Sequence, residues 1–296
     1  MYKILKAEEL ADKIFLMDVE APRVARHCEP GQFVIVKMDE KGERIPLTIC
    51  DYDREKGTIT IVFQIVGAST LKMAELKSGD SFRDFTVPLG CPSEFVNEDL
   101  EALKNKKMLF VAGGVGAAPV YPQVKWLHER GIDADVIVGS KTKNMLILEE
   151  EMKAVAENVY IATDNGSYGF AGRATDLLQK LVKEDGKVYN KAVIIGPMIM
   201  MKFTTMTTKE LGIPTIVSLN PIMVDGTGMC GACRVTVGDE VKFACVDGPE
   251  FDGFKVNFDE AMRRQTIYKT AEGKAKLEFE EGATHKNGGC GCGGDK

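Results

Sequence analysis

The chain of 296 residues contains 44% hydrophobic and 28% charged residues, and its 38 Lys and Arg against 44 Asp and Glu give a formal net charge of −6. This length predicts two domains, or two domains and a small module, and the composition excludes a disordered or collagen-like chain. The acidic balance and the lack of a basic block in the sequence argue against nucleic acid as a partner.

The sequence contains no evident targeting or membrane-spanning segment. Met1 to Lys6 runs directly into acidic residues, so the apolar core of a signal peptide is missing there. The longest uncharged stretch, 108–124, is interrupted by glycine and proline and is shorter than the roughly 20 apolar residues of a spanning helix. We therefore expect a cytoplasmic protein without a membrane span.

The first part of the chain, residues 1–97, has the pattern of antiparallel β-structure. Short runs rich in Val, Ile, Phe and Thr, such as 31–36 and 58–63, alternate with charged turns such as 39–42 and 54–57. A small barrel closes such strands without leaving exposed edges. The pattern therefore predicts a β-barrel domain.

Residues 98–220 have a different period. Short apolar runs alternate with helical patterns, and Leu177, Leu178 and Leu181 have the spacing of a helix that packs one face against a core. Strands that alternate with helices predict a parallel, doubly wound sheet. The five predicted strands are 108–112, 135–138, 159–162, 192–195 and 215–218.

After Asn220 this alternation stops. A loop rich in Gly and Cys precedes two short strand-like runs, and Phe258 to Thr270 has the pattern of a helix. From Ala271 onward the chain is charged and without an apolar period, which predicts a flexible tail. The predicted division is a β-barrel over 1–97, an α/β domain over 98–220, a small module with its C-terminal helix over 221–268, and a tail over 269–296.

A glycine-rich turn directly follows the first strand of the α/β region. The run from Gly113 through Gly114, Gly116 and Ala117 to Pro119 would let backbone amides approach a phosphate at a helix N-terminus. Its pattern, G-G-x-G-x-x-P, differs from the G-x-G-x-x-G of ordinary Rossmann domains and indicates a related nucleotide-binding domain. Two loops that follow later strands, 163–167 and 196–198, are expected at the same sheet edge. A plain turn without a ligand is the alternative at each place.

Two stretches of the β-region are candidates for binding a phosphorylated ring cofactor. Arg44-Ile45-Pro46-Leu47-Thr48 combines a cation, exposed backbone and a hydroxyl, and Gln64 to Thr70 follows the strongest predicted strand into a turn. Taken alone, the first stretch is better explained as the start of a strand. The second is a helix cap that could also bind an anion.

The most specific signal is a loop in which Asp225, Cys230, Cys233 and Cys245 have the spacing D-x4-C-x2-C-x11-C. Thiolates at this spacing, with glycines that expose amides to cluster sulfides, favour a [2Fe–2S] centre. The plant-type pattern has a cysteine at the position of Asp225, so the fourth ligand would be an oxygen. A structural zinc site and a redox dithiol are the alternatives.

Together and in this order, the motifs at 44–48, 67–70, 113–119 and 196–197 and the cysteine loop resemble the ferredoxin–NADP reductase superfamily. Within it, residues 1–268 are similar to the electron-transfer subunits of dihydroorotate dehydrogenase. They are more similar still to the small (alpha) subunits of electron-bifurcating NADH-dependent ferredoxin:NADP oxidoreductase, also known as sulfide dehydrogenase subunits. The resemblance implies an FAD-binding barrel, an NAD-binding domain and a C-terminal [2Fe–2S] module.

The resemblance also implies roles for the motif residues. Those expected along the flavin are Pro46, Leu47 and Thr48, with Thr48 near its reactive edge. Gln64, Ile65 and Val66 are expected to line the rest of the FAD, and those expected at the pyrophosphate are Arg44, Gly67, Ser69 and Thr70. Those expected at the nicotinamide dinucleotide are Gly113, Gly114, Gly116, Ala117, Pro119, Asp164, Gly196, Pro197 and Met198. The expected cluster ligands are Asp225, Cys230, Cys233 and Cys245.

Two residues depart from the superfamily pattern. Arg44 stands four residues before Thr48, whereas the superfamily's arginine usually stands three residues before its Ser or Thr. Asp225 stands where dihydroorotate-type subunits have a cysteine, and an aspartate at this place is a feature of the bifurcating type.

The implied function is electron transfer from NADH through FAD and a [2Fe–2S] cluster to a larger flavin/[4Fe–4S] partner subunit. Ferredoxin and NADP(H) are expected as partners through that larger subunit. Hydride transfer depends on stacked cofactors, so no catalytic side chain is expected. The alternatives are the electron-transfer subunit of NAD-dependent dihydroorotate dehydrogenase, a stand-alone flavin reductase with structural zinc, and a structural subunit poor in cofactors.

Several residues have no place in this scheme. Ser140, Lys141 and Lys143 could meet a 2′-phosphate, but the family likeness favours NAD(H). The remaining cysteines are interpreted as small packing residues (Cys28, Cys50 and Cys91) or as adventitious thiols of the tail that could bind a metal (Cys290 and Cys292).

Overall fold

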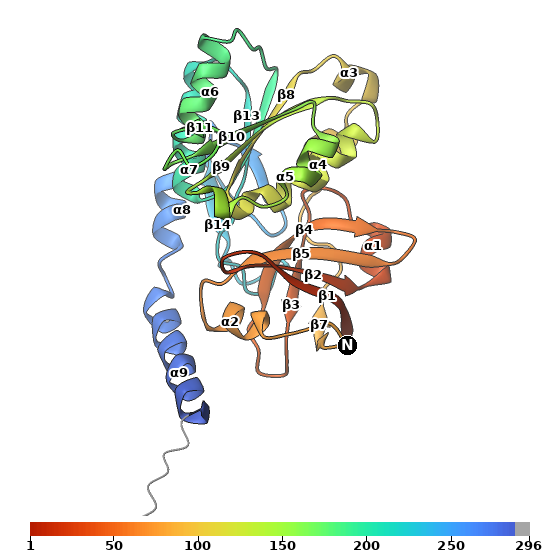
Figure 1. The fold of residues 1–296 in the computed structure, drawn as a ribbon, viewed down its shortest axis with the longest axis vertical. Coiled ribbons are helices and arrows are strands. Elements are labelled where there is room, and N and C mark those ends of the chain that lie inside the picture. Colours follow the sequence, from red (N-terminus) through yellow and green to blue (C-terminus); the bar gives the residue numbers. More distant parts are fainter. Residues whose placement is uncertain (288–296) are drawn as a thin grey trace, which may run out of the picture.

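The computed structural model describes the backbone of residues 1–287 and the side chains of residues 1–281. Figure 1 shows an α/β layer at the top, a β-barrel below it and two C-terminal helices along one side. Within the described residues, no helix has both the length and the apolar character that crossing a membrane requires.

The N-terminal part is an antiparallel sheet of seven strands in the order β6-β1-β2-β5-β4-β3-β7. Its edge strands β6 and β7 are separated by one residue in the chain, so the sheet is bent into a nearly closed barrel and the predicted barrel is confirmed. Ile4, Met17, Ile59, Ile61 and Phe63 are among its fully buried core residues. The elements are β1 (Tyr2–Ala11), β2 (Ile14–Glu20), α1 (Pro22–His27), β3 (Phe33–Lys37), β4 (Ile45–Asp53), β5 (Thr58–Gln64), α2 (Ala68–Ala74), β6 (Ser81–Phe82) and β7 (Asp84–Phe85).

The second part is a sheet in the order β11-β10-β9-β8-β12-β13-β16. All five strands predicted from the apolar runs are present, and their mutual pairings are parallel. Helices cover both faces of this sheet: α4 and α5 pack on one face, and α6 and α7 pack on the other. The elements are η1 (Glu94–Asn97), α3 (Leu100–Lys104), β8 (Met108–Gly113), η2 (Gly114–Gly116), α4 (Ala117–His128), β9 (Ala134–Ser140), η3 (Lys143–Met145), α5 (Glu149–Val155), β10 (Asn158–Thr163), β11 (Phe170–Ala171), α6 (Ala174–Lys183), β12 (Lys191–Ile195), α7 (Met198–Glu210) and β13 (Thr215–Ser218).

The strand order reverses between β8 and β12. From β8 the chain moves to β9 and β10 on one side, and it then crosses to β12 and β13 on the other. In open α/β sheets, ligands bind outside the carboxyl ends of the strands at this point.

The last part forms a small hairpin of β14 (Arg234–Val237) and β15 (Glu240–Phe243), in agreement with the two predicted runs. The chain then returns to the α/β sheet as β16 (Glu250–Asp252), which pairs antiparallel with β13. The sequence did not predict β16. This strand joins the small module to the α/β domain through backbone hydrogen bonds.

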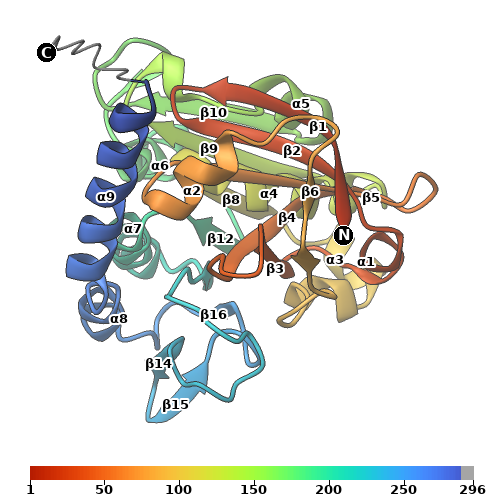
Figure 2. The ribbon, with the colours of Figure 1, turned by 90° about the horizontal axis from the view of Figure 1, so that it is seen from below.

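The structure differs from the sequence prediction at the C-terminus. The predicted helix ends early, as α8 (Phe258–Arg264), and a second helix, α9 (Lys269–Asn287), replaces the predicted tail as far as it is described. Charged residues of α9 form i,i+4 pairs, such as Lys274 with Glu278 at 3.8 Å, which stabilise a helix without an apolar period. Phe279 also lies under the Lys72 ammonium of α2, 5.5 Å from ring centre to nitrogen, and both views show α9 beside α2 (Figures 1 and 2). Cys290 and Cys292 lie outside the described residues.

Candidate functional site

The loop between β13 and β14 carries Asp225, Cys230 and Cys233. Its tight path depends on glycines, since Gly226 and Gly228 have φ of 76° and 82°, a region that side chains disfavour. The Asp225 carboxylate accepts hydrogen bonds from the backbone amides of Thr227 (3.0 Å), Met229 (3.2 Å) and Cys230 (2.9 Å). These amides, that of Thr227 foremost, lower the pKa of Asp225, so the carboxylate is an anion at neutral pH.

The hairpin of β14 and β15 brings two of the predicted ligands together. Cys233 precedes β14 and Cys245 follows β15, both are buried, and their sulfur atoms lie 3.2 Å apart. Burial raises the pKa of the Cys245 thiol to about 12. Cys230 is exposed on the loop. A positively charged group bound here would offset the cost of ionising these thiols.

The four predicted ligands do not converge fully. Across the residues that the structure describes, no three His, Cys, Asp or Glu side chains are close enough to hold one metal ion. The donor chemistry nevertheless fits an iron–sulfur group, because three free thiols and an ionised carboxylate share one glycine-rich loop and hairpin. Their assignment as ligands stays a prediction.

The barrel presents an open edge at the residues predicted to contact the flavin. β4 pairs with β3 through Ile45 to Thr48 and with β5 only from Ile49 onward, so the two ladders separate there. Pro46, Leu47 and Thr48 are half-buried at this point, and Gln64 and Ile65 at the end of β5 are half-buried too, whereas Val66 is 75% exposed. A flat aromatic ring could cover such an apolar, partly exposed strand surface.

The turn that precedes α2 is a helix cap, as predicted. The Thr70 hydroxyl accepts hydrogen bonds from the amides of Val66 (2.9 Å) and Gly67 (3.0 Å) and donates to the Gly67 carbonyl (3.0 Å). The Ser69 hydroxyl donates to the carboxylate of Glu43. Both hydroxyls predicted at the pyrophosphate thus have partners within the protein.

The Arg44 side chain makes its hydrogen bonds with a different part of the chain. Its Nε donates to the Val224 carbonyl at 2.9 Å, and its Nη2 donates to the Asp225 carbonyl at 3.0 Å. The structure therefore brings the predicted pyrophosphate arginine onto the backbone of the predicted cluster loop. This contact spans about 180 residues of sequence and was not predicted.

Two glycine turns meet at the carboxyl ends of β8 and β12. A Cβ added to Gly116 would lie 2.2 Å from the Ile195 carbonyl oxygen, and one added to Gly196 would lie 3.1 Å from the Gly113 Cα. Gly114 has φ of 55° and open space where its Cβ would be. Close backbone approach thus explains Gly116 and Gly196, and the Met200 side chain, 2.1 Å from an added Cβ, explains Gly113. Gly114 leaves the turn accessible to a ligand at the point where strand order reverses.

The other predicted nucleotide residues occupy different positions on this edge. Ala117 and Pro119 form the first turn of α4, and Pro197 and Met198 begin α7, with Pro197 exposed and Met198 buried. Asp164 is exposed after β10, and β9 lies between β10 and β8. Asp164 is therefore two strands away from the Gly113 turn.

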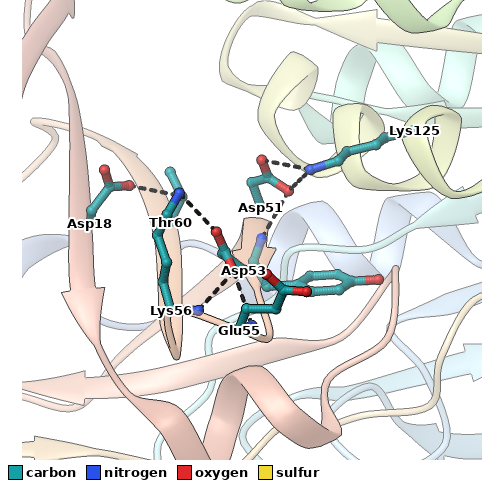
Figure 3. A network of polar contacts seen from close by, with 8 residues as sticks. Asp18, Asp51, Asp53, Glu55, Lys56, Thr60 and Lys125 are labelled. Carbon is teal, nitrogen blue, oxygen red and sulfur yellow. Dashed lines mark hydrogen bonds and ion pairs between the residues drawn. The ribbon is translucent and has the colours of Figure 1, made fainter. Parts of the chain in front are cut away.

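An ion pair joins the α/β layer to the barrel. Figure 3 shows Lys125 of α4 donating to both carboxylate oxygens of Asp51 on β4, at 2.7 Å and 3.0 Å, across the boundary between the two parts. Asp18 and Thr60 form a separate bond of 2.6 Å within the barrel. Because α4 begins at the Gly113 turn, the Lys125 contact orients this turn relative to the barrel edge.

Glu250 at the start of β16 was missed by sequence reasoning. One oxygen of its carboxylate accepts from the Ser93 hydroxyl and from the Gln123 amide, both at 2.9 Å. Ser93 belongs to the segment after the barrel and Gln123 to α4, so this carboxylate joins three parts of the chain. Desolvation raises the pKa of Glu250 to about 7, while the two hydrogen bonds oppose the shift. A single Glu carries no motif that could have revealed this junction.

Comparisons with known proteins agree with an iron–sulfur module at the C-terminal end of the chain. Residues 220–257 match the sequence model of the iron-sulfur cluster binding domain of dihydroorotate dehydrogenase B. The chain is 44% identical over 278 residues, 94% of each chain, to the dihydroorotate dehydrogenase B (NAD(+)) electron transfer subunit homolog of Thermotoga maritima. The chain belongs to the family of these electron-transfer subunits and their homologues. The family's subunit from Geobacillus thermodenitrificans is 33% identical over 254 residues, 84% of this chain and 94% of the relative.

Solved structures of other proteins have the same fold as this chain. A structure described as giving insights into flavin-based electron bifurcation, that of the NADH-dependent reduced ferredoxin-NADP oxidoreductase, matches with 42% identity and a TM-score of 0.86 over 94% of this chain and 98% of that chain. A ferredoxin NADP+ reductase from Neisseria gonorrhoeae matches with 19% identity and a TM-score of 0.57 over 71% of this chain and 90% of that chain. The predicted ferredoxin–NADP reductase-like fold with a C-terminal iron–sulfur module is thus confirmed.

Proposed function

We propose that this chain is the NAD(H)-oxidising flavin and iron–sulfur subunit of an electron-bifurcating ferredoxin:NADP+ oxidoreductase. The observation that carries the proposal is the direct contact of the cysteine loop with Arg44, the barrel residue directly before the strand predicted to bear the flavin. It occurs in a chain 42% identical to a bifurcating enzyme over nearly its whole length. A flavin and a cluster on these two elements would be close neighbours.

The chain's own residues would position the cofactors. The open edge at Pro46, Leu47 and Thr48 would hold the flavin ring of FAD, and the accessible turn at Gly113 and Gly114 would hold the dinucleotide of NAD(H). When bound, these groups supply hydride transfer and the cluster supplies single-electron transfer. The protein contributes orientation, and the Lys125–Asp51 pair is one of the contacts between the α/β layer and the barrel.

The proposed ligands of the [2Fe–2S] cluster are Asp225, Cys230, Cys233 and Cys245. Cys233 and Cys245 already adjoin each other, and Cys230 and Asp225 are linked through the hydrogen bond of the Cys230 amide. The ionised state of Asp225 suits an oxygen ligand to iron. The match of 220–257 to an iron-sulfur binding domain supports this set over a zinc site.

The partner in this proposal is a larger flavin/[4Fe–4S] subunit, through which ferredoxin and NADP(H) exchange electrons in the cytoplasm. The relatives are named electron transfer subunits, which supports a complex with a larger subunit. A dihydroorotate dehydrogenase is the second candidate for this partner, and the same family names favour it. Asp225 favours the flavin/[4Fe–4S] subunit as the partner, because dihydroorotate-type subunits are expected to have cysteine at this position.

Anaerobic purification of the natural complex tests the proposal. We expect a flavin spectrum, iron and acid-labile sulfide in equal amounts, a co-purifying flavin/[4Fe–4S] subunit, and electron exchange among NADH, ferredoxin and NADP(H) in the assembled complex. Zinc without iron or sulfide would contradict the cluster, and a chain without flavin absorbance would favour a structural subunit. Co-purification with a dihydroorotate-oxidising subunit would establish the second candidate instead.

A further inference from the structure

Arg44 joins the barrel to the cysteine loop through a forked contact. Two different nitrogens of one guanidinium donate to the carbonyls of two successive loop residues, Val224 at 2.9 Å and Asp225 at 3.0 Å. Such paired donation fixes direction as well as distance, because the guanidinium is planar and rigid. The contact therefore restrains the cysteine loop at its start, where the predicted ligand Asp225 lies.

A second contact next to this one holds the same loop. Gly226 approaches the barrel so closely that an added Cβ would lie 2.5 Å from Ile35 Cδ1 and 2.9 Å from Leu89 Cδ1. Ile35 on β3 pairs directly with Pro46 on β4. The loop thus packs on the neighbour of the strand that is predicted to bear the flavin, and only a glycine permits this approach.

Residues other than Arg44 form the hydrogen bonds of the helix cap before α2. Glu43, which directly precedes Arg44, accepts a hydrogen bond from the Ser69 hydroxyl. The Thr70 hydroxyl accepts hydrogen bonds from the backbone amides of Val66 and Gly67 in the same turn. The guanidinium itself extends to the loop carbonyls. The sequence spacing agrees, since Arg44 stands one residue farther from Thr48 than the superfamily's phosphate-binding arginine does from its Ser or Thr.

We propose that Arg44 is a positioning residue that fixes the cluster loop on the flavin barrel, and that it does not bind the FAD pyrophosphate. This inference rests on the proposed function for its redox consequences. A cation beside the loop stabilises the more negative, reduced cluster, and hydrogen bonding and nearby charge are established determinants of cluster potential. Arg44 therefore sets both the placement and the potential of the cluster.

Three variants test the proposal. Arg44→Gln removes the forked contact, Gly226→Ala forces the loop away from Ile35 while leaving Arg44 in place, and Arg83→Gln is the control, because Arg83 pairs with Glu40 on the barrel surface. The measurements are the FAD content and affinity, the cluster's midpoint potential and electron paramagnetic resonance line shape, and hydrogen exchange of the Thr227, Met229 and Cys230 amides in the cofactor-free chain.

We expect Arg44→Gln to retain FAD, to shift the cluster potential in the negative direction and to accelerate loop exchange by about tenfold or more, because two charge-assisted hydrogen bonds are removed. Gly226→Ala should reproduce the faster exchange and a changed line shape, and Arg83→Gln should change none of these. Loss of FAD from Arg44→Gln with an unaltered cluster, or unchanged loop exchange, would overturn the proposal. A wild-type complex without iron would refute the proposed function, while the exchange measurement would still decide the role of Arg44.

Discussion

Replacing Glu250 by Gln probes the junction between the three parts of the chain. A glutamine keeps the oxygen that accepts from Ser93 and Gln123, but it cannot ionise. The neighbouring Gln123 also has a buried Oε1 without a hydrogen-bond partner, so the new amide adds a donor next to an unsatisfied acceptor. The substitution therefore removes the charge and preserves the contacts.

The expected magnitude follows from the pKa of Glu250, which rises from 4.5 to about 7 on folding, chiefly by desolvation. The residue is only partly buried, but its partners Ser93 and Gln123 are fully buried, so the carboxylate is shielded. A raised pKa means that the folded state binds the proton more tightly, so this residue's stabilisation is complete below pH 4.5 and falls as the pH rises to 7. The change amounts to about 3 kcal/mol at most.

The assay is denaturant unfolding of wild type and Glu250→Gln between pH 4.5 and 8. We expect the variant to gain stability relative to wild type as the pH rises, by up to about 3 kcal/mol, with no further gain above about pH 8. Glu240→Gln is the control, because Glu240 is exposed and its pKa is lowered, so it responds only below pH 4.5. A constant difference between Glu250→Gln and wild type over this range would refute the reasoning.

Three further predictions concern the cluster, the nucleotide turn and the contact between the two domains. Asp225→Cys should retain a cluster but change its midpoint potential, and an unchanged potential in a redox titration would show that Asp225 is not a ligand. Gly116→Ala should lower the free energy of unfolding by about 1–3 kcal/mol and weaken NADH binding in a fluorescence titration, because its Cβ would lie 2.2 Å from the Ile195 carbonyl oxygen. Gly114→Ala should lower the free energy of unfolding by only about 1 kcal/mol, because its backbone has φ of 55° and its Cβ would meet open space. Lys125→Met should lower stability by about 1 kcal/mol or less, and a double-mutant cycle with Asp51→Asn should show coupling if this partly buried pair holds the two domains.

Local pattern was sufficient for most of the fold. The apolar runs around Phe110 and Ile194 became buried parallel strands, and the glycines from Gly113 to Gly116 became a strand-to-helix turn. Both outcomes depend on residues close together in the chain, where period, β-branching and glycine content act directly. The order of the motifs then sufficed to indicate the family.

The sequence pattern failed where contacts between distant segments decide the conformation. The charged α9 has no apolar period, yet it forms a helix that is supported by its ion pairs and by Phe279 against Lys72. β16 is a strand because β13 offers a free edge, and three residues carry too little pattern to predict that.

The sequence by itself determined the barrel, the parallel sheet and the chemical identity of the cluster loop, because spacing and residue type express these features locally. Only the tertiary structure decided that Arg44 contacts Val224 and Asp225, that Gly113 meets Gly196, and that Glu250 joins Ser93 to Gln123. Each of these contacts brings together residues that are far apart in the chain. Their proximity, and the shifted pKa of Glu250, arise from packing, which no local pattern encodes.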